Sequence, residues 1–598
     1  MGTYGGTTEA AKPPACELDA CSPPPAYSTL TACDREEETM DEKGDYRTMT
    51  LGRREFVKVG GLGAAAAAAI GTTACGPDAA TTRGSTDDAP WWTTETFELE
   101  EATFADLLAD MASGRRSAVE ITQLYLDRIA AVDREGPKLR AIIETNPDAL
   151  DIARQLDEER AGGSLRGPLH GIPIVVKDNI DTADRMTTTA GSYALEGHVA
   201  AQDSHVAAQL RKAGAIILAK SNLSEWANFR STRSTSGWSG RGGQCGNAYA
   251  VDRSPCGSSA GSGAATSANL CAGSIGTETN GSIVCPSSLN GVVGLKPTVG
   301  LVGRSGIIPI SHTQDTAGPM VRTVADAAAM LTPLAGPDPR DPMSQASAPY
   351  AGTDYSSFLQ ADALQGARIG VERSYFGQDR HRDDLMEQAI VDMAAAGATI
   401  IDPASLNNRG EYNAPAYQLM LYEFKADLQT YFSTVSPELG MRTLEDLIAF
   451  NEANADREMP YFGQEILIAA NEMGPLTDMP YLELKETARR LSQEEGIDRV
   501  MEEHQLDAIV APTTRAAWKT DLINGGLSSL GSSSPAAISG YPSITVPMGS
   551  VHGLPIGMLF FGRAWGEGRL IQLAYSYEQT TRHRRPARML PTLDLRNA

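Results

Sequence analysis

The sequence is poor in cysteine and in positive charge. Its 598 residues include eight cysteines, and 51 lysines and arginines stand against 75 aspartates and glutamates, which gives a net charge of −24. So few cysteines in a chain of this length do not form the dense disulfide framework of a small secreted scaffold. The acidic balance argues against a nucleic acid partner, because the phosphate backbone would repel it.

Metal-binding patterns are also missing. Four cysteines are neighbours in sequence at spacings of 11, 15 and 14 residues, without the C-x2-C pair typical of structural zinc sites: Cys245, Cys256, Cys271 and Cys285. A zinc site is the alternative interpretation. We expect four buried thiols and no metal.

No long hydrophobic run marks the N-terminal part of the chain. The alanine-rich run that ends at Ile70 spans about a dozen residues, whereas a membrane span needs roughly 20. The pair Arg53-Arg54 before it is typical of a twin-arginine export signal, and Cys75 lies in a segment that resembles a lipoprotein cleavage site. The prediction is an exported, periplasmic or cell-surface protein tethered through Cys75. An alanine-rich helix with a basic start is the alternative.

The remaining composition predicts one large folded unit, since 41% of the residues are hydrophobic. The expected organisation is a disordered segment or wrongly placed start at 1–48, a signal at 49–75, a flexible tether at 76–95 and a single domain at 96–598. Met40 or Met49 is the alternative start. Within the domain, residues 335–496 are rich in helix formers and are expected to form a helical insertion that selects substrate, or else a simple surface insertion.

A stretch rich in glycine and serine, residues 256–298, contains the first candidate catalytic residues. Serine hydroxyls can act as nucleophiles where a base removes their proton and backbone N–H groups stabilise the resulting oxyanion. Ser258 and Ser282 are the candidates. A flexible linker is the alternative, but the apolar runs Ile283-Val284 and Val292–Leu295 favour buried strands.

The stretch has no histidine, so the base must come from elsewhere. Upstream, the apolar strand predicted at Gly171–Val176 is followed by Lys177. Burial disfavours the charged ammonium, and a buried lysine can therefore be neutral near pH 7 and accept a proton. A solvated lysine at a strand end is the more common situation, and only the combination with the serine-rich stretch favours a base.

These segments together resemble the amidase signature enzymes, which hydrolyse carboxylic amides with a Ser-Ser-Lys triad. The resemblance covers roughly 500 residues. It includes GIPIVVKDNI at 171–180, KSNLSEWANF at 220–229, the serine-rich block, DTAGPM at 315–320, and the C-terminal segments LDAIVAPT, GYPSITVP and GLPIGMLFFGR. EWANFRS and GWSGRGGQ are closest to the motifs of bacterial peptide amidases.

The resemblance implies a role for each candidate. Ser282 is the expected nucleophile, Ser258 the bridging serine that follows a cis peptide bond in the family, and Lys177 the general base. The backbone N–H groups of Thr279, Asn280, Gly281 and Ser282 are the expected oxyanion hole. Neither a metal nor a cofactor is implied.

Two features of the block depart from the expected pattern. The common family sequence is DTGGSIR, whereas this chain has ETNGSIV at 278–284. Asn280 replaces a glycine, and asparagine is among the residues that best tolerate such a turn. Val284 replaces an arginine and removes a charge beside the nucleophile.

A competing motif overlaps the same block. Gly257–Gly261 also satisfies G-x-S-x-G, which would make Ser259 the nucleophile of an α/β-hydrolase elbow. That motif requires a preceding strand, but residues 252–256 are polar and contain a proline. The interpretation with Ser282 is therefore favoured.

The expected fold is α/β, with a large mixed, mostly parallel sheet covered by helices on both faces. A capping box at Ser117–Glu120 predicts a helix, and a second helix is predicted at 204–213, ended by Gly214. Short apolar runs at 216–219 and 509–511 predict buried strands.

The function predicted from the sequence is hydrolysis of a linear carboxylic amide, such as a peptide's C-terminal amide, to acid and ammonia. The partner is a small-molecule or peptide substrate. The alternatives are a catalytically idle lipoprotein that only binds ligands, and an amidotransferase-type subunit, which the acidic charge disfavours.

Overall fold

A computed structural model describes Gly2, residues 97–406, Asn408 and residues 410–595. The expected signal at 49–75 and tether at 76–95 lie outside the described residues, as does nearly all of 1–48. The chain divides into two units, Met1–Gly84 and Ser85–Ala598, and the second contains every described residue except Gly2. Within the described part, no helix combines the length and apolarity needed to cross a bilayer.

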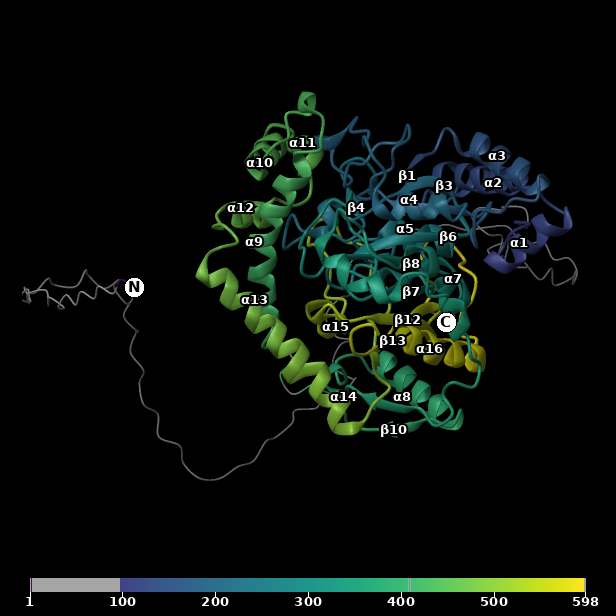
Figure 1. The fold of residues 1–598 in the computed structure, drawn as a ribbon, viewed down its shortest axis with the longest axis vertical. Coiled ribbons are helices and arrows are strands. Elements are labelled where there is room, and N and C mark those ends of the chain that lie inside the picture. Colours follow the sequence, from purple (N-terminus) through teal and green to yellow (C-terminus); the bar gives the residue numbers. More distant parts are fainter. Residues whose placement is uncertain (1, 3–96, 407, 409, 596–598) are drawn as a thin grey trace, which may run out of the picture. The chain divides into compact units, whose positions relative to one another are not determined.

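One mixed sheet of eleven strands runs through the second unit (Figure 1). Parallel pairing joins β3, β2 and β6 near one end and β11, β9 and β10 at the other, whereas the strands between them pair antiparallel. In spatial order the strands are β1 (Ile142–Thr145), β3 (Ile216–Ser221), β2 (Pro173–Lys177), β6 (Gly273–Glu278), β8 (Thr316–Val321), β7 (Val293–Lys296), β12 (Ser543–Val551), β13 (Leu554–Phe561), β11 (Ala508–Pro512), β9 (Arg368–Val371) and β10 (Thr399–Ile401).

Helices cover both faces of this sheet. The helices are α1 (Phe104–Ser113), α2 (Ala118–Arg128), α3 (Ala149–Ala161), α4 (His205–Lys212), α5 (Ala260–Ser267), α6 (Val284–Leu289), α7 (Val324–Leu334), α8 (Arg380–Ala395), α9 (Asn413–Phe432), α10 (Leu444–Ala453), α11 (Ala455–Glu458), α12 (Glu465–Asn471), α13 (Met479–Ser492), α14 (Arg499–His504), α15 (Ser534–Ser539) and α16 (Glu567–Thr581). Successive side chains of a strand point to opposite faces. Along β13, Phe560 belongs to a cluster that includes residues of α7, α8 and α16, and Phe561 to another that includes residues of α6, α14 and α15. The expected α/β class, with a large mixed sheet between helices, is confirmed.

Local sequence signals account for several element boundaries. Ser117 caps α2, and both hydrogen bonds of the predicted capping box are present. Ser204 caps α4, and Gly214 follows the helix with φ +87°, a conformation that favours glycine. The apolar runs predicted as buried strands at 216–219 and 509–511 form parts of β3 and β11.

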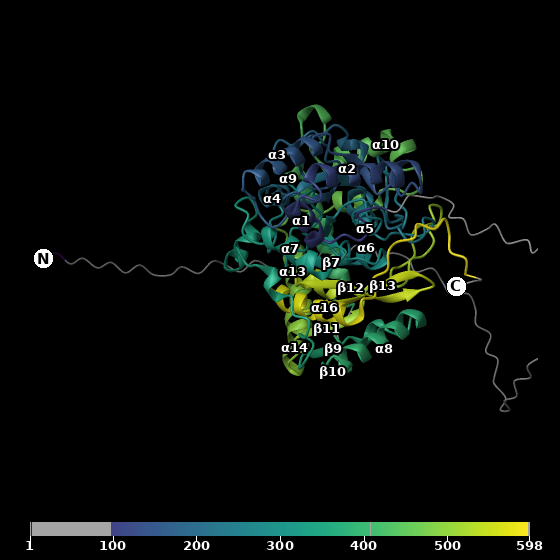
Figure 2. The ribbon, with the colours of Figure 1, turned by 90° about the vertical axis from the view of Figure 1, so that its right-hand side faces the viewer.

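The segment 335–496 contains a separate helical layer. Helices α9, α10 and α12 share a hydrophobic cluster that includes Phe424, Phe432 and Leu447. Helices α9 to α13 lie along one edge of the unit in Figure 1 and behind the sheet in Figure 2. The segment is not helical throughout, because β9 and β10 extend the main sheet. The short apolar stretches that form these two strands were absent from the sequence prediction.

Candidate active site

Lys177 is the last residue of β2 and is completely buried. Burial lowers the pKa of its ammonium to about 7, although the negative charges of Asp315 and Glu278 oppose this shift. A substantial fraction of the side chain is therefore neutral near pH 7 and able to accept a proton.

Two hydroxyl groups hold the Lys177 side chain. Its Nζ lies 2.7 Å from the Ser258 hydroxyl and 2.7 Å from the hydroxyl of Thr277 on β6. Asn179 donates a further hydrogen bond of 3.0 Å to the same Thr277 hydroxyl. The peptide bond between Gly257 and Ser258 is cis. The contact between Lys177 and Ser258 joins residues 81 positions apart in the sequence, and it provides a path for a proton between them.

Ser282 lies in the turn between β6 and α6. Its backbone carbonyl accepts a hydrogen bond of 3.2 Å from the N–H of Ser259, which places the turn against the residue that follows Ser258. Among the described residues, no hydrogen bond joins the Ser258 and Ser282 hydroxyls directly. The Ser282 side chain lines an open groove, with 9% of its surface exposed.

Asn280 occupies the turn without a left-handed conformation. Gly281, and not Asn280, adopts the left-handed conformation, with φ +87°. Asn280 instead accepts a hydrogen bond of 2.7 Å from Ser533, just before α15. Asn280 therefore connects the turn to the start of α15.

The expected strand at Ile283-Val284 is also wrong. The Glu278 carboxylate accepts hydrogen bonds from the N–H groups of Ile283 and Val284, at 2.7 and 3.0 Å. Such capping satisfies N–H groups that lack partners at a helix start, and α6 begins at Val284. The second apolar run, by contrast, forms β7.

The turn presents free backbone donors. Within the part of the chain that the structure describes, none of four consecutive N–H groups donates a hydrogen bond to the protein: those of Thr279, Asn280, Gly281 and Ser282. Unused donors that converge on one turn can stabilise a developing oxyanion.

Asp315 is a positioning residue that the sequence analysis did not single out. Its carboxylate accepts a hydrogen bond of 2.6 Å from the Thr279 hydroxyl and two more from the N–H groups of Ile310 and Ser311. Burial raises the pKa of Asp315 to about 6. The DTAGPM motif contained this residue, but a motif alone does not show that the aspartate fixes the turn beside Ser282.

Ser259 is placed unfavourably for the elbow hypothesis. Its side chain is fully buried, and its hydroxyl donates to the Thr277 carbonyl and accepts from the Thr277 N–H, at 3.0 and 3.2 Å. The residues just before it form turns and bends instead of the strand that the elbow requires.

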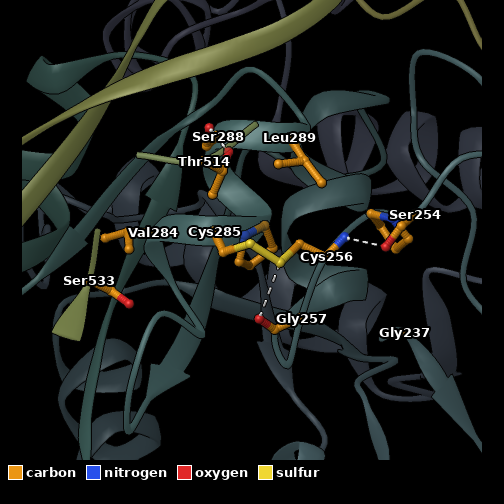
Figure 3. The surroundings of a disulfide bond; sticks show 12 residues. Gly237, Ser254, Cys256, Gly257, Val284, Cys285, Ser288, Leu289, Thr514 and Ser533 are labelled. Carbon is orange, nitrogen blue, oxygen red and sulfur yellow. Dashed lines mark hydrogen bonds between the residues drawn. A yellow bond between two sulfur atoms is a disulfide. The ribbon is translucent and has the colours of Figure 1, made fainter. Parts of the chain in front are cut away.

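The expectation of four free thiols is wrong for one pair. Cys256 and Cys285 form a disulfide (Figure 3). Cys245 and Cys271 are free and buried. The bridge links the segment before Ser258 to the helix after Ser282, 29 residues apart. A loop of this length corresponds to roughly 3–4 kcal/mol of stabilisation by restriction of the unfolded chain. Neighbouring cysteine spacings did not predict it, because the pair forms only when the two serine segments meet.

The groove at Ser282 has a volume of about 440 Å³ and an uncharged lining. Its walls combine apolar side chains with many hydroxyl groups, and Tyr417, Met420 and Ile466 come from the helical layer. Of the aromatic residues in that layer, Phe424 and Phe432 belong instead to its hydrophobic cluster. An uncharged ligand suits such a lining.

Comparisons with known proteins agree with this architecture. A family model described as Amidase matches residues 120–571. The native peptide amidase of Stenotrophomonas maltophilia is a similar solved structure, with 52% identity and a TM-score of 0.78 over 83% of this chain and all of that one. A probable amidase of Arabidopsis thaliana is 38% identical over 83% of this chain and 93% of its own length.

More distant relatives include proteins with a different named function. One of them, a glutamyl-tRNA(Gln) amidotransferase subunit of Symbiobacterium thermophilum, is 34% identical over 79% of this chain and 96% of its own length. The family model matches most of the chain, and the sequence identity to the amidases is substantial. The similarity therefore extends beyond a shared fold. The chain belongs to the amidase family and is a hydrolase that acts on amide C–N bonds.

Proposed function

We propose that the protein hydrolyses linear carboxylic amides, among them the C-terminal carboxamides of peptides, to acid and ammonia. The observation that carries the proposal is the contact of 2.7 Å between the buried Lys177 and Ser258, beside the groove that Ser282 lines. The similarity to a peptide amidase supports the choice of a peptide substrate.

The proposed reaction uses Ser282 as nucleophile. Its hydroxyl attacks the amide carbon and gives its proton to Ser258, which passes its own proton to neutral Lys177. The free N–H groups of the turn stabilise the oxyanion. The proton then returns through Ser258 to the departing nitrogen, so that ammonia leaves and an acyl group remains on Ser282. A water molecule attacks this ester by the same relay and releases the acid.

The lining of the groove supports a neutral peptide as acyl group. Hydroxyl groups such as those of Thr232 and Ser234 can bond a peptide backbone, while Phe229 and Trp518 can contact apolar side chains. A carboxylate would have no cationic partner in this lining, since no charged residue contributes to it.

Ammonia release tests the function directly. Purified protein should release ammonia from N-blocked dipeptide amides, and at least about tenfold more slowly from the corresponding amides with an acidic last residue, because the groove offers no counter-charge. Fatty and aryl amides complete the panel. An idle binding protein would release ammonia from none of them, and an amidotransferase-type subunit would require a partner protein.

We also propose that the protein is exported by its twin-arginine segment and anchored through Cys75. The disulfide between Cys256 and Cys285 supports this location, because such bonds persist in oxidising compartments. Mass spectrometry of the mature protein from its host should find a lipidated N-terminus at Cys75 and a bridged Cys256–Cys285 peptide. An intact N-terminus upstream of the arginine pair, with both thiols reduced, would contradict export.

A further inference from the structure

A second cavity adjoins the groove. It has a volume of about 500 Å³ and shares three lining residues with the groove, Ala227, Thr279 and Ile310. Its wall also includes Thr277, whose hydroxyl accepts a hydrogen bond from Lys177, and Asn179, which donates to the same hydroxyl. The two cavities thus meet beside the turn that precedes Ser282.

The cavity wall near Lys177 contains hydrogen-bond acceptors without donors. Asn179 is 2% exposed, its amide N–H bonds Thr277, and its Oδ1 has no partner among the described residues. His198 is 3% exposed and its Nδ1 likewise has no partner in the described part of the chain. Tyr431 donates to Asp181 at 2.9 Å, so its oxygen is free to accept from His198 Nε2 at 3.3 Å. The imidazole nitrogen that remains, Nδ1, is then an acceptor.

The charged residues of the cavity also favour a ligand with donors and positive charge. Four aspartates line it, and Asp341 and Asp427 are paired with Arg304 and His312. Asp315 holds the turn by hydrogen bonds, as described above. Asp181 forms no ion pair within 4 Å among the described residues, although Lys220 and Arg340, which also lines the cavity, act on it from further away. Unpaired acceptors and a carboxyl group fit a ligand that brings hydrogen-bond donors and positive charge.

We propose that this cavity binds the amine half of N-substituted amides and favours amines that carry a second cationic group. The inference rests on the proposed function. The departing nitrogen receives its proton from Ser258, whose partner Lys177 also bonds Thr277 of the cavity wall. Ammonia needs about the volume of a water molecule, roughly 30 Å³, and the cavity is far larger. The acyl group lies in the uncharged groove. The C–N bond breaks as the acyl-enzyme forms, the nitrogen takes the proton from Ser258 and leaves as the free amine, and water then attacks the ester on Ser282.

Three substrates with one acyl group test the proposal: an N-blocked dipeptide as primary amide, as N-pentylamide and as N-(4-aminobutyl)amide. The two substituents have the same length, so only the charge differs. We expect kcat/KM for the aminobutylamide to exceed that for the pentylamide by about tenfold or more, and Asp181→Asn to bring this ratio close to one. The matched control is Asp151→Asn, which removes an exposed carboxylate paired with Arg154 on α3 and should leave the ratio unchanged.

The outcomes separate the two proposals. If the primary amide is hydrolysed and neither N-substituted amide is, the cavity does not bind the amine half and the proposed function stands. If no amide is hydrolysed, the proposed function fails.

Product inhibition of the wild-type protein provides a second measurement that needs no variant. We expect 1,4-diaminobutane to inhibit at least about tenfold more strongly than butylamine. Equal inhibition by both amines would overturn the inference, as would an effect of Asp181→Asn that follows the charge of the acyl group instead of that of the amine.

Discussion

Replacing Ser282 by alanine is expected to lower kcat by about 10⁴- to 10⁶-fold, because the hydroxyl that forms the acyl-enzyme is removed while the oxyanion donors remain. The side chain is small, lines the groove and makes no hydrogen bond that the fold requires within the described residues. We therefore expect the melting temperature of the variant to stay close to that of the wild type. Ammonia release from a peptide amide measures the effect.

Labelling with a fluorophosphonate probe tests the role of Ser282 as nucleophile without any choice of substrate. Mass spectrometry should place the label on Ser282 in the wild-type protein and find none in the alanine variant. Ser259→Ala is the matched control, because the Ser259 hydroxyl bonds only the backbone of Thr277, and this variant should keep turnover within about tenfold and still be labelled. A label on Ser259, or wild-type turnover in the Ser282 variant, would contradict the assignment.

The sequence was informative where local physics decides the structure. Caps at Ser117 and Ser204 and the apolar strand before Lys177 depend on neighbours along the chain, and the structure has these elements where they were predicted. The candidate site also depended on motif spacing, which brought Lys177 and Ser258 to attention without any geometric information. The structure adds their contact.

What the sequence could not predict depends on particular side-chain contacts, two of them between residues far apart in the sequence. The strand expected at Ile283-Val284 became a helix start because the Glu278 carboxylate, five residues upstream, bonds both N–H groups. The pairing of Cys256 with Cys285 requires the two serine segments to meet. The role of Asp315 requires a loop from beyond β7 to reach Thr279. In each case one particular side-chain contact fixes the structure, and hydrophobic periodicity does not indicate such contacts.

Replacing Lys177 by methionine is expected to lower kcat/KM by about 10²- to 10⁴-fold, the usual range for loss of a general base. In the wild-type protein the base must be neutral to act. Because the pKa of Lys177 is lowered to about 7, kcat/KM should rise with pH, reach a plateau above about pH 8, and fall tenfold per unit below pH 7. The variant should lose this ascending limb. A pH profile of kcat/KM measures both effects.

Lys296 offers a matched control for this experiment. It is also completely buried, burial lowers its pKa to about 8, and its Nζ donates to the Pro297 carbonyl, away from either serine. Lys296→Met should therefore keep the midpoint near pH 7. If the same limb persists in Lys177→Met, another group, such as Asp315 with its pKa of about 6, sets the profile.

Stability provides a readout that separates the base from a purely structural lysine. Between pH 7 and pH 10.5 the unfolded chain binds a proton on Lys177 that the folded chain does not, so the free energy of unfolding rises with pH across this window. Lys177→Met should flatten that rise without unfolding the protein, because methionine fills the space without the cost of a buried charge. Urea denaturation at pH 7 and pH 9 measures the difference between the variant and the wild type. An equal slope in both proteins would mean that the lysine keeps an ordinary pKa in the fold and could not serve as the neutral base.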